Sequence, residues 1–303
     1  MKQWIFIIFI FLLSVFCYGQ GYLDSLPIIN KGEILVLGEY HFLQEMQDVE
    51  HDIILNYSKT SQDLVVVFLE LPYQFNFYVK NLFEQGDSIL LKTYFKHFSS
   101  VKTRIYGYNL ILSLYRMYIE TPTLQVYCID RNSCESSTLY TIRELLNTYP
   151  NCPESIQKMK HYQKECRHIV IVGNTHANKE KIQFSKISYN PKTKPLAWQL
   201  NNINKSPFRH KVYTIHLTPQ NIIFPETIIN DSLTIASKEV TWITPGIPNH
   251  IRKELEAQKK DVAIKMINPS EYPDIHRQYD GFILIKKAHS SIPGNKETIE
   301  SNW

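Results

Sequence analysis

Four stretches of the sequence consist mostly of apolar residues, and each is six or seven residues long. They are Glu33–Gly38, Leu64–Leu69, Thr123–Ile129 and His168–Gly173. A short run with few polar positions is typical of a strand that is buried on both faces of a sheet. We therefore predict four buried strands before residue 180.

The segments between these runs carry apolar residues at the three- and four-residue spacing of amphipathic helices. The predicted helices are Phe42–Ser58, Gln74–Glu84, Ser88–Phe98, Tyr108–Glu120, Thr138–Thr148 and Pro153–Cys166. Alternation of strands and helices favours a parallel sheet that is covered by helices on both faces. The predicted fold class is therefore α/β, with a mostly parallel central sheet flanked by helices.

After Asn178 the pattern changes to shorter apolar runs that are separated by turns rich in proline and asparagine. The clearest are Lys211–Leu217, Lys238–Ile243 and Gly281–Ile285. No low-complexity linker divides them from the first half of the chain. We expect these C-terminal strands to extend the same sheet, so that residues 20–303 form a single domain.

Residues 1–19 have the three-part pattern of a secretory signal peptide. Lys2 is their only charge, an apolar run follows from Ile5 to Phe16, and small Gly19 precedes Gln20. The run is short for a membrane span, which needs about 20 residues. We predict cleavage after Gly19, export to the periplasm or the medium, and no transmembrane segment in the mature chain. Lipid attachment at Cys17 is the less favoured alternative, because bulky Phe16 precedes it.

The charge balance argues against a polyanionic partner. The chain has 33 basic and 29 acidic residues, and removal of Lys2 with the signal leaves a net charge of +3. This charge is too small to indicate binding to nucleic acid or to an anionic membrane surface. A small-molecule or peptide substrate fits the composition better.

Export places the cysteines of the mature chain in a compartment where disulfides persist. The four are Cys128, Cys134, Cys152 and Cys166, and their spacing contains no C-x-x-C zinc or redox unit. Three complete pairings are open to four cysteines, and buried thiols are an equal alternative. The sequence does not choose between them.

Ionisable side chains follow each of the four predicted buried strands. These strand exits are Gly38–His41, Glu70, Asp130 and Gly173–His176. In parallel α/β sheets, ligands bind at the carboxyl ends of the strands. Two exits share the form Gly-x-x-His, in which the glycine permits a tight turn and the histidine projects over the sheet edge. We therefore expect these residues to form one site.

The residue types at these exits point to acid–base or metal chemistry. If the following helix begins near Tyr40, His41 lies one turn from Glu45, a spacing suited to a histidine–carboxylate pair. Glu70 directly follows apolar residues, so desolvation should raise its pKa unless a cation stabilises its charge. Each residue also has an ordinary structural interpretation. The histidines can sit in turns, Glu39 and Arg116 can be solvated, Glu70 can favour a helix N-terminus, and Asp130 can cap a loop.

Several common catalytic signatures are missing from the sequence. It contains no G-x-S-x-G elbow and no H-E-x-x-H motif. It also lacks a P-loop and a G-x-G-x-x-G fingerprint. These absences argue against an ordinary serine hydrolase mechanism and against the usual phosphate- and dinucleotide-binding sites.

The order of the motifs between residues 33 and 285 resembles that of the erythromycin esterase-like family. The motifs are Leu37–Glu45, Glu70, the helix with Arg116, Val126–Asp130, Val172–Asn178 and Tyr279–Ile285. They also resemble the wider superfamily of Tiki, TraB-type and ChaN-like haem-binding proteins. This resemblance implies an active site of Glu39, His41, Glu70 and His176, with Arg116 and Asp130 in support.

The resemblance also bears on cofactor and substrate. Erythromycin esterases have a histidine where this chain has Gly173, which argues against a macrolide lactone as the substrate. The Gly-x-x-His form of the second motif is closer to the Tiki and TraB branch, which implies a divalent metal held by His41, Glu70 and His176. The predicted function is an exported hydrolase that activates water to cleave an ester, lactone or peptide bond. The alternative is a ChaN-like protein that binds haem or another metal complex through the same histidines, without catalysis.

Overall fold

The structure is a computed structural model. It describes residues 21–59, 63–96, 101–130, 166–180, 194–204, 206–224, 227–229, 233–235, 238–241 and 247–290, with the backbone alone at 101–106, 227–229, 233–235 and 238. The predicted signal peptide and the predicted helices Thr138–Thr148 and Pro153–Cys166 lie outside the described residues, except for Cys166 itself. No described helix is both long enough and apolar enough to cross a membrane.

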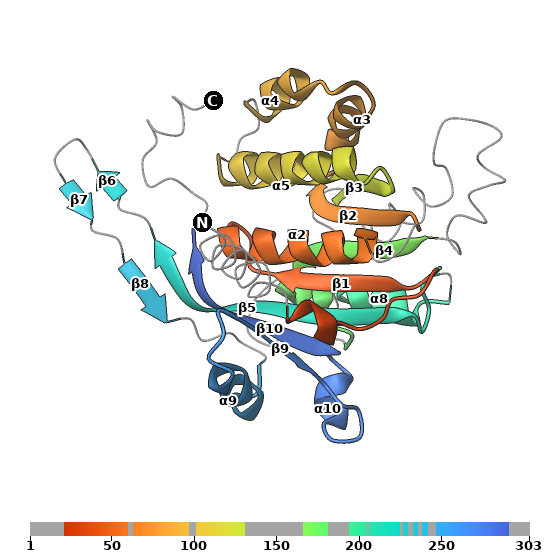
Figure 1. Cartoon of the computed structure of the whole chain (residues 1–303), viewed down its shortest axis with the longest axis vertical. Coiled ribbons are helices and arrows are strands. Elements are labelled where there is room, and N and C mark those ends of the chain that lie inside the picture. The colour runs from red at the N-terminus through yellow and green to blue at the C-terminus, as the bar shows by residue number, and fades with distance from the viewer. Residues whose placement is uncertain are drawn as a thin grey trace, which may run out of the picture.

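A central sheet of eight strands organises the described part of the chain (Figure 1). Its order is β3-β2-β4-β1-β5-β10-β9, and β8 pairs with β5. Six neighbouring strands, from β3 to β10, run parallel. Strand β9 pairs antiparallel with β10, and β8 pairs antiparallel with β5. The strands are β1 Ile34–Glu39, β2 Val65–Pro72, β3 Leu124–Asp130, β4 Arg167–Gly173, β5 Val212–Phe224, β8 Lys238–Thr241, β9 Val262–Met266 and β10 Gly281–His289, and a separate hairpin contains β6 Thr227–Ile229 and β7 Leu233–Ile235.

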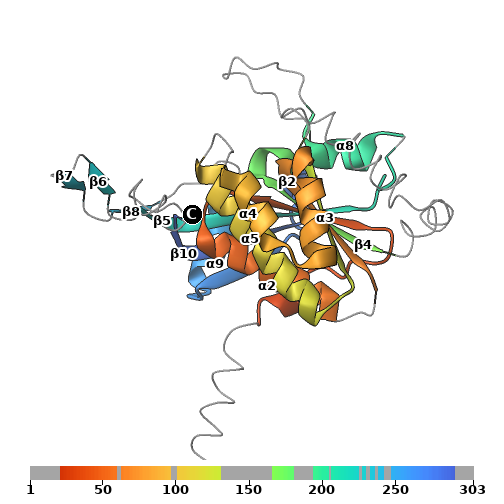
Figure 2. The same ribbon diagram turned by 90° about the horizontal axis from the view of Figure 1, so that it is seen from above.

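Helices cover both faces of this sheet, as predicted for the fold class. One face packs against α2 and α5, with α3 and α4 beyond them, and the other packs against α8 and α9 (Figure 2). The helices are α2 Gln44–Lys59, α3 Asn76–Gln85, α4 Ser88–Lys96, α5 Val101–Glu120, α8 Leu196–Asn202, α9 Asn249–Ala257 and α10 Pro273–His276, and the short 3₁₀ turns are η1 Leu23–Ser25, η2 Tyr73–Phe75 and η3 Asn174–Ala177.

Alternating side chains of each strand enter the two cores. In β1, Leu35 and Leu37 pack on the α2 side, and Ile34 and Val36 pack on the α8 side. All four are fully buried. A strand covered on both faces needs apolar residues at every position, and this requirement explains the continuous runs in the sequence.

Helix α2 begins two residues later than predicted. Phe42 has a φ of 74°, which lies in the left-handed region and is incompatible with a helix through this residue. His41 therefore lies in the turn between β1 and α2 rather than on the helix. The conditional pairing of His41 with Glu45, which required a helix from about Tyr40, does not form; Glu45 instead bonds His289 at the end of β10.

Two of the four cysteines of the predicted mature chain, Cys128 and Cys166, lie within the described residues. Cys128 is a free and fully buried thiol, so a complete pairing of all four cysteines does not occur. Burial raises the pKa of the Cys128 thiol, which makes it unreactive. Cys166 is buried as well, whereas Cys134 and Cys152 lie outside the described residues.

Candidate functional site

The carboxyl ends of β1, β4 and β2 lie side by side in the sheet. Glu39 is in register with Gly173 across β1 and β4, and Leu69 of β2 is in register with Ile171 of β4. Glu70 follows Leu69 directly, and the turn after β4 carries His176. The parallel topology thus brings together the side chains that the strand exits predicted, although they are up to 137 residues apart in the sequence.

His41 lies between two carboxylates. Its Nδ1 is 2.8 Å from Oε1 of Glu39, and its Nε2 is 3.6 Å from Oε2 of Glu70. Burial disfavours the charged imidazole, but the hydrogen bonds and negative charges of the two carboxylates outweigh burial and raise the pKa of His41 to about 10. His41 is therefore an imidazolium at neutral pH in the ligand-free protein.

Glu70 links His41 to His176 and to the backbone of β4. Its Oε1 is 3.3 Å from Nε2 of His176, and its Oε2 accepts a hydrogen bond of 2.7 Å from the N–H of Gly173. Burial would raise the pKa of Glu70, but the two histidines and this N–H lower it overall. The lowered pKa of Glu70 is the outcome expected where a positive partner stabilises its charge, because His41 and His176 both face the carboxylate.

Both glycines of the Gly-x-x-His motifs shape the site. A Cβ on Gly38 would lie 2.6 Å from Cβ of Ala177, so the bare backbone of β1 lets the η3 turn pack against it. A Cβ on Gly173 would lie 3.2 Å from Nε2 of His41, 3.5 Å from the His176 ring and 3.6 Å from Oε2 of Glu70. The missing side chain of Gly173 thus leaves space that faces all three ionisable groups.

A small cavity of about 10 Å³, room for about one water molecule, lies beside these groups. It is lined by the ionisable residues Glu39, His41 and Glu70 and by the aliphatic residues Leu69, Leu71, Leu110 and Ile171. The aliphatic walls exclude bulk water from one side of the His41 imidazole, which strengthens the electrostatic interactions in the site. Leu110 comes from α5, so this helix forms part of the wall.

Glu50 belongs to the site, although the strand exits did not indicate it. It lies on α2 and is completely buried, and the charge of Glu39 acts on it. Burial, together with the nearby charge of Glu39, raises the pKa of Glu50 well above its usual range. A signal was present in the sequence: Glu50 follows Met46 by four residues and precedes Ile53 and Ile54, on the apolar stripe of the helix.

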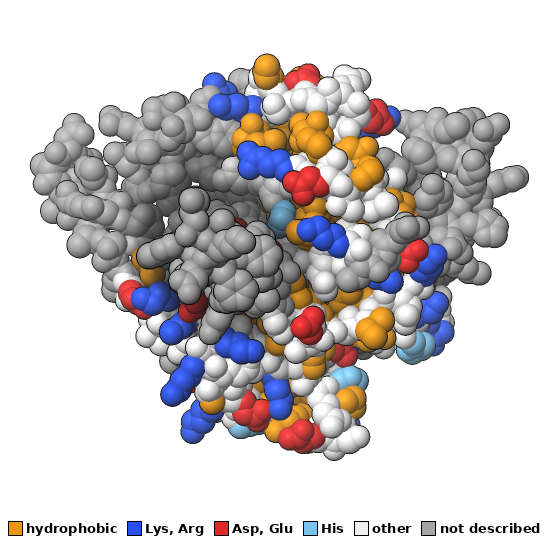
Figure 3. Space-filling view, in the orientation of Figure 1, with side chains coloured by type: hydrophobic (Ala, Val, Ile, Leu, Met, Phe, Trp, Pro, Cys, Tyr) orange, Lys and Arg blue, Asp and Glu red, His pale blue; other side chains and the backbone are white. Residues whose placement is uncertain are grey.

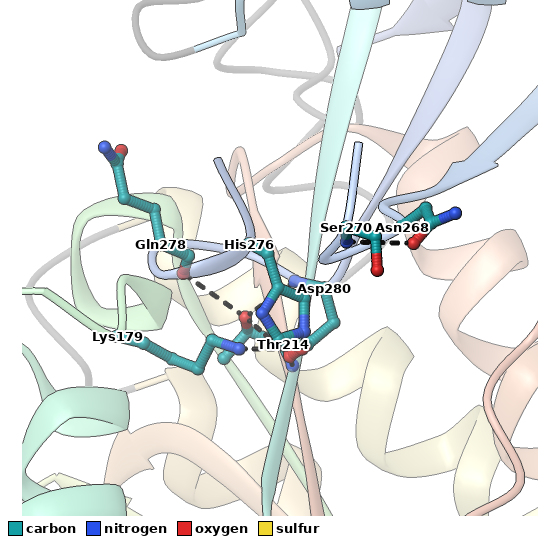
Figure 4. Close-up of polar contacts among 7 residues, drawn as sticks. All are labelled: Lys179, Thr214, Asn268, Ser270, His276, Gln278 and Asp280. Carbon is teal, nitrogen blue, oxygen red and sulfur yellow. Dashed lines mark hydrogen bonds and ion pairs between the residues drawn. The ribbon is translucent and has the colours of Figure 1, made fainter. Parts of the chain in front are cut away.

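A second polar cluster holds the η3 turn against the sheet (Figure 4). Just after this turn, Nζ of Lys179 lies 2.7 Å from Oδ1 of Asp280, which precedes β10. Nε2 of His276 is 3.1 Å from the same oxygen, and the N–H of Thr214 donates to Oδ2 over 2.7 Å. Asp280 therefore ties the segment that carries His176 to β5 and β10.

Two predicted supporting residues are placed differently from the central four. Arg116 is exposed on α5 and is not among the described residues that line the cavity. Asp130 ends β3, in register with Pro72 of β2, and does not line the cavity formed by the described residues. Glu39, His41, Glu70 and His176 thus form a contiguous group.

The described residues do not support the divalent-metal site that the resemblance implied. They contain no group of three or more His, Cys, Asp and Glu side chains arranged to hold a metal ion. Oε1 of Glu70 lies 3.3 Å from Nε2 of His176, and its Oε2 lies 3.6 Å from Nε2 of His41.

The described side chains on the face in Figure 3 have mixed charge. Acidic and basic side chains are interspersed over much of this face, with apolar patches between them, and several Lys and Arg side chains lie close together at the lower left.

Comparison with known proteins places the fold. No protein-family model and no curated protein matches the sequence. A Bacillus cereus protein of known structure aligns with 90% of this chain and 93% of its own, at 12% identity and a TM-score of 0.55. A mutant of the erythromycin esterase EreC in its open conformation aligns with 91% of this chain and 96% of its own, at 10% identity and a TM-score of 0.56.

A haem-binding ChaN protein of Campylobacter jejuni also aligns, over 62% of this chain and 82% of its own, at 11% identity. Its TM-score of 0.33 is too low to support an argument. The fold assignment therefore depends on the two proteins with higher scores. The chain has the erythromycin esterase-like α/β fold that its sequence motifs indicated.

Proposed function

We propose that the protein is a hydrolase that cleaves an ester, lactone or peptide bond with water activated at His41. The observation that carries the proposal is the convergence of Glu39, His41, Glu70 and His176 beside a cavity with aliphatic walls. A histidine whose Nδ1 is bonded to a buried carboxylate is a common arrangement for proton transfer in hydrolysis. The shared fold with an erythromycin esterase supports the same class of reaction.

In the proposed reaction, neutral His41 takes a proton from water at Nε2 while the water attacks the carbonyl carbon. Glu39 accepts a hydrogen bond at Nδ1, which fixes the tautomer and stabilises the imidazolium that forms. The imidazolium then returns the proton to the leaving group. The space beside Gly173 lies next to Nε2 of His41 and has room for the attacking water.

Glu70 and His176 have a different role in this reaction. Glu70 holds both imidazoles and is itself fixed by the N–H of Gly173. His176, with Nε2 directed at Glu70, supplies positive or polar character near the oxygen that becomes negative in the transition state. The substrate is proposed to be a small molecule or a peptide, met after export of the chain from residue 20 onward.

The test uses purified protein from residue 20 and a panel of ester, lactone and peptide substrates. H41A and H176A should each lower kcat/KM by roughly 10²–10⁴-fold, the usual contribution of a proton-transfer residue. H250A, at an exposed position of α9, is the matched control and should retain full activity. Turnover should also survive treatment with a chelator, because the proposed steps use side chains alone. Undiminished hydrolysis by H41A would refute the role of His41.

The haem-binding alternative has its own readout. Titration of the same protein with haem would give a Soret shift that is lost in H41A and H176A if these histidines ligate iron. The structure favours hydrolysis, because Nε2 of both histidines lies within 3.6 Å of Glu70. We therefore expect no histidine-dependent Soret shift.

A further inference from the structure

One carboxylic acid lies within the apolar stripe of α2. Met46, Ile53 and Ile54 of this stripe are fully buried against the sheet, and Glu50 is buried to the same extent. Burial of a charged carboxylate costs several kcal/mol, and even a neutral acid loses its hydration. Leucine at this position would pack without that cost, so the presence of glutamate calls for a functional explanation.

The side chain of Glu50 faces another carboxylate between α2 and the sheet. Among the described residues, no N–H or O–H donor reaches either of its carboxyl oxygens. Glu39 ends β1 on the same face as Leu35 and Leu37, which pack against α2, and its charge acts on Glu50. Two carboxyl groups can share a hydrogen bond only when one of them carries a proton, because ionised carboxylates are acceptors alone.

The geometry decides which of the two holds that proton. Nδ1 of His41 lies 2.8 Å from Oε1 of Glu39 and donates a hydrogen bond to it. Burial and the charge of Glu39 both act against the ionised form of Glu50. The proton therefore resides on Glu50, whose O–H donates to the carboxylate of Glu39.

We propose that Glu50 is a positioning residue, whose carboxylic O–H fixes the Glu39 carboxylate that orients His41. The proposal deepens the proposed function and rests on it, because it assigns a further residue to the same site. It also explains why α2 has an acid on its buried face: the helix holds the Glu39 side chain at the end of β1. Glu50 itself touches neither water nor substrate in this arrangement.

Two substitutions of Glu50 separate positioning from packing. E50Q keeps a donor, since its amide N–H₂ can bond to Glu39, and should retain most of kcat. E50L removes the donor and should lower kcat by roughly 10–100-fold, the loss typical of residues that orient a functional histidine, with little change in KM. E50L should nevertheless be as stable as wild type or more stable, because apolar replacement of a buried polar group is often stabilising.

The control is Q47L, which replaces another buried polar residue of α2 by leucine. It should leave kcat unchanged, because the hydrogen bond proposed to fix Glu39 comes from Glu50 alone. Unchanged kcat in E50L would overturn the proposal, and so would equal losses in E50Q and E50L. A fall in kcat for Q47L as large as that for E50L would also overturn it, since general disturbance of α2 would then explain both.

Two spectroscopic measurements do not depend on activity. Infrared difference spectra of wild type should contain a protonated carboxyl band that E50Q lacks. The downfield proton resonance of His41 Nδ1–H should persist in E50Q and be lost or shifted in E50L. Absence of the carboxyl band in wild type would overturn the proposal even if E50L fails to fold. If both signals behave as expected but no substrate is cleaved, the proposed hydrolysis fails while the positioning role stands.

Discussion

His41 is surrounded by two carboxylates, and this environment predicts an alkaline pH dependence. Its pKa is raised to about 10, so the neutral imidazole that accepts a proton from water is scarce at pH 7. We expect kcat/KM to rise with pH and to level off near pH 10. E39Q removes one carboxylate, so it should lower the pKa of His41 and move the plateau to lower pH. Measured pH–rate profiles of both proteins test this, and a plateau already reached below pH 7 in wild type would contradict it.

Gly173 gives a second test at the scale of single residues. In G173A the new Cβ would lie 3.2 Å from Nε2 of His41, inside the space proposed for the attacking water. We expect kcat/KM to fall by roughly 10²-fold, the effect of displacing reacting groups by about 1 Å. G21A is the control, because a Cβ at Gly21 has no heavy atom within 4 Å. Equal activities of the two variants would place the water elsewhere.

Strand-end position identified some residues of the site from the sequence and not others. Glu39, His41, Glu70 and His176 follow buried runs, so the topology of a parallel sheet brings them to one edge. Glu50 was not found, because a glutamate on an amphipathic helix is normally assigned to the polar face. Its place on that helix depends on tertiary packing, which the local pattern specifies only weakly.

The elements of the fold were predictable where the local pattern was strong. The four apolar runs became β1 to β4, because a strand buried on both faces has almost no polar positions. The helices α8, α9 and α10 and the antiparallel strand β9 were not predicted. Helices α8 and α10 and strand β9 are seven residues or fewer, too short for a period to stand out, and α9 is only nine residues long.

The ion pair between Lys179, just after η3, and Asp280, just before β10, predicts that D280N strongly destabilises the protein. The Lys179–Asp280 pair has side chains that are only 8% and 11% exposed. D280N leaves the Lys179 ammonium without its buried counter-charge, which typically costs about 3–5 kcal/mol. It should also loosen the turn that carries His176 and so lower kcat/KM. Thermal and urea unfolding, together with kinetics, measure both effects.

The control for this prediction is an exposed ion pair in the same region. Arg277 and Asp274 lie 3.6 Å apart, with side chains that are 67% and 88% exposed. D274N should change the free energy of unfolding by less than about 1 kcal/mol, because water screens the pair. Similar losses in D274N and D280N would mean that the buried cluster has no special structural role.

For the whole molecule, three histidines in different environments shape the dependence of stability on pH. Burial lowers the pKa of His168 to about 4 and that of His216 to about 3, so both are neutral in the folded protein. Below about pH 6.5 the unfolded chain binds protons at these two residues more readily than the native state does. Their contribution to stability is therefore lost as the pH falls. His41 has the opposite shift, since its pKa is raised to about 10. The stability that His41 contributes is fully present below about pH 6.5 and is lost as the pH rises through 10.

Substitution of His216 tests the acidic side of this curve. Its ring is packed among Tyr40, Tyr279 and Phe282, and neither ring nitrogen has a hydrogen-bond partner among the described residues. H216L should therefore be at least as stable as wild type at pH 8, because it removes two buried polar atoms. As the pH falls from 6.5 toward 3, wild type should lose the stability linked to both buried histidines, whereas H216L should lose only the part linked to His168. Urea unfolding of both proteins across this range measures the difference, and parallel acid limbs would show that His216 is not the group that titrates on unfolding.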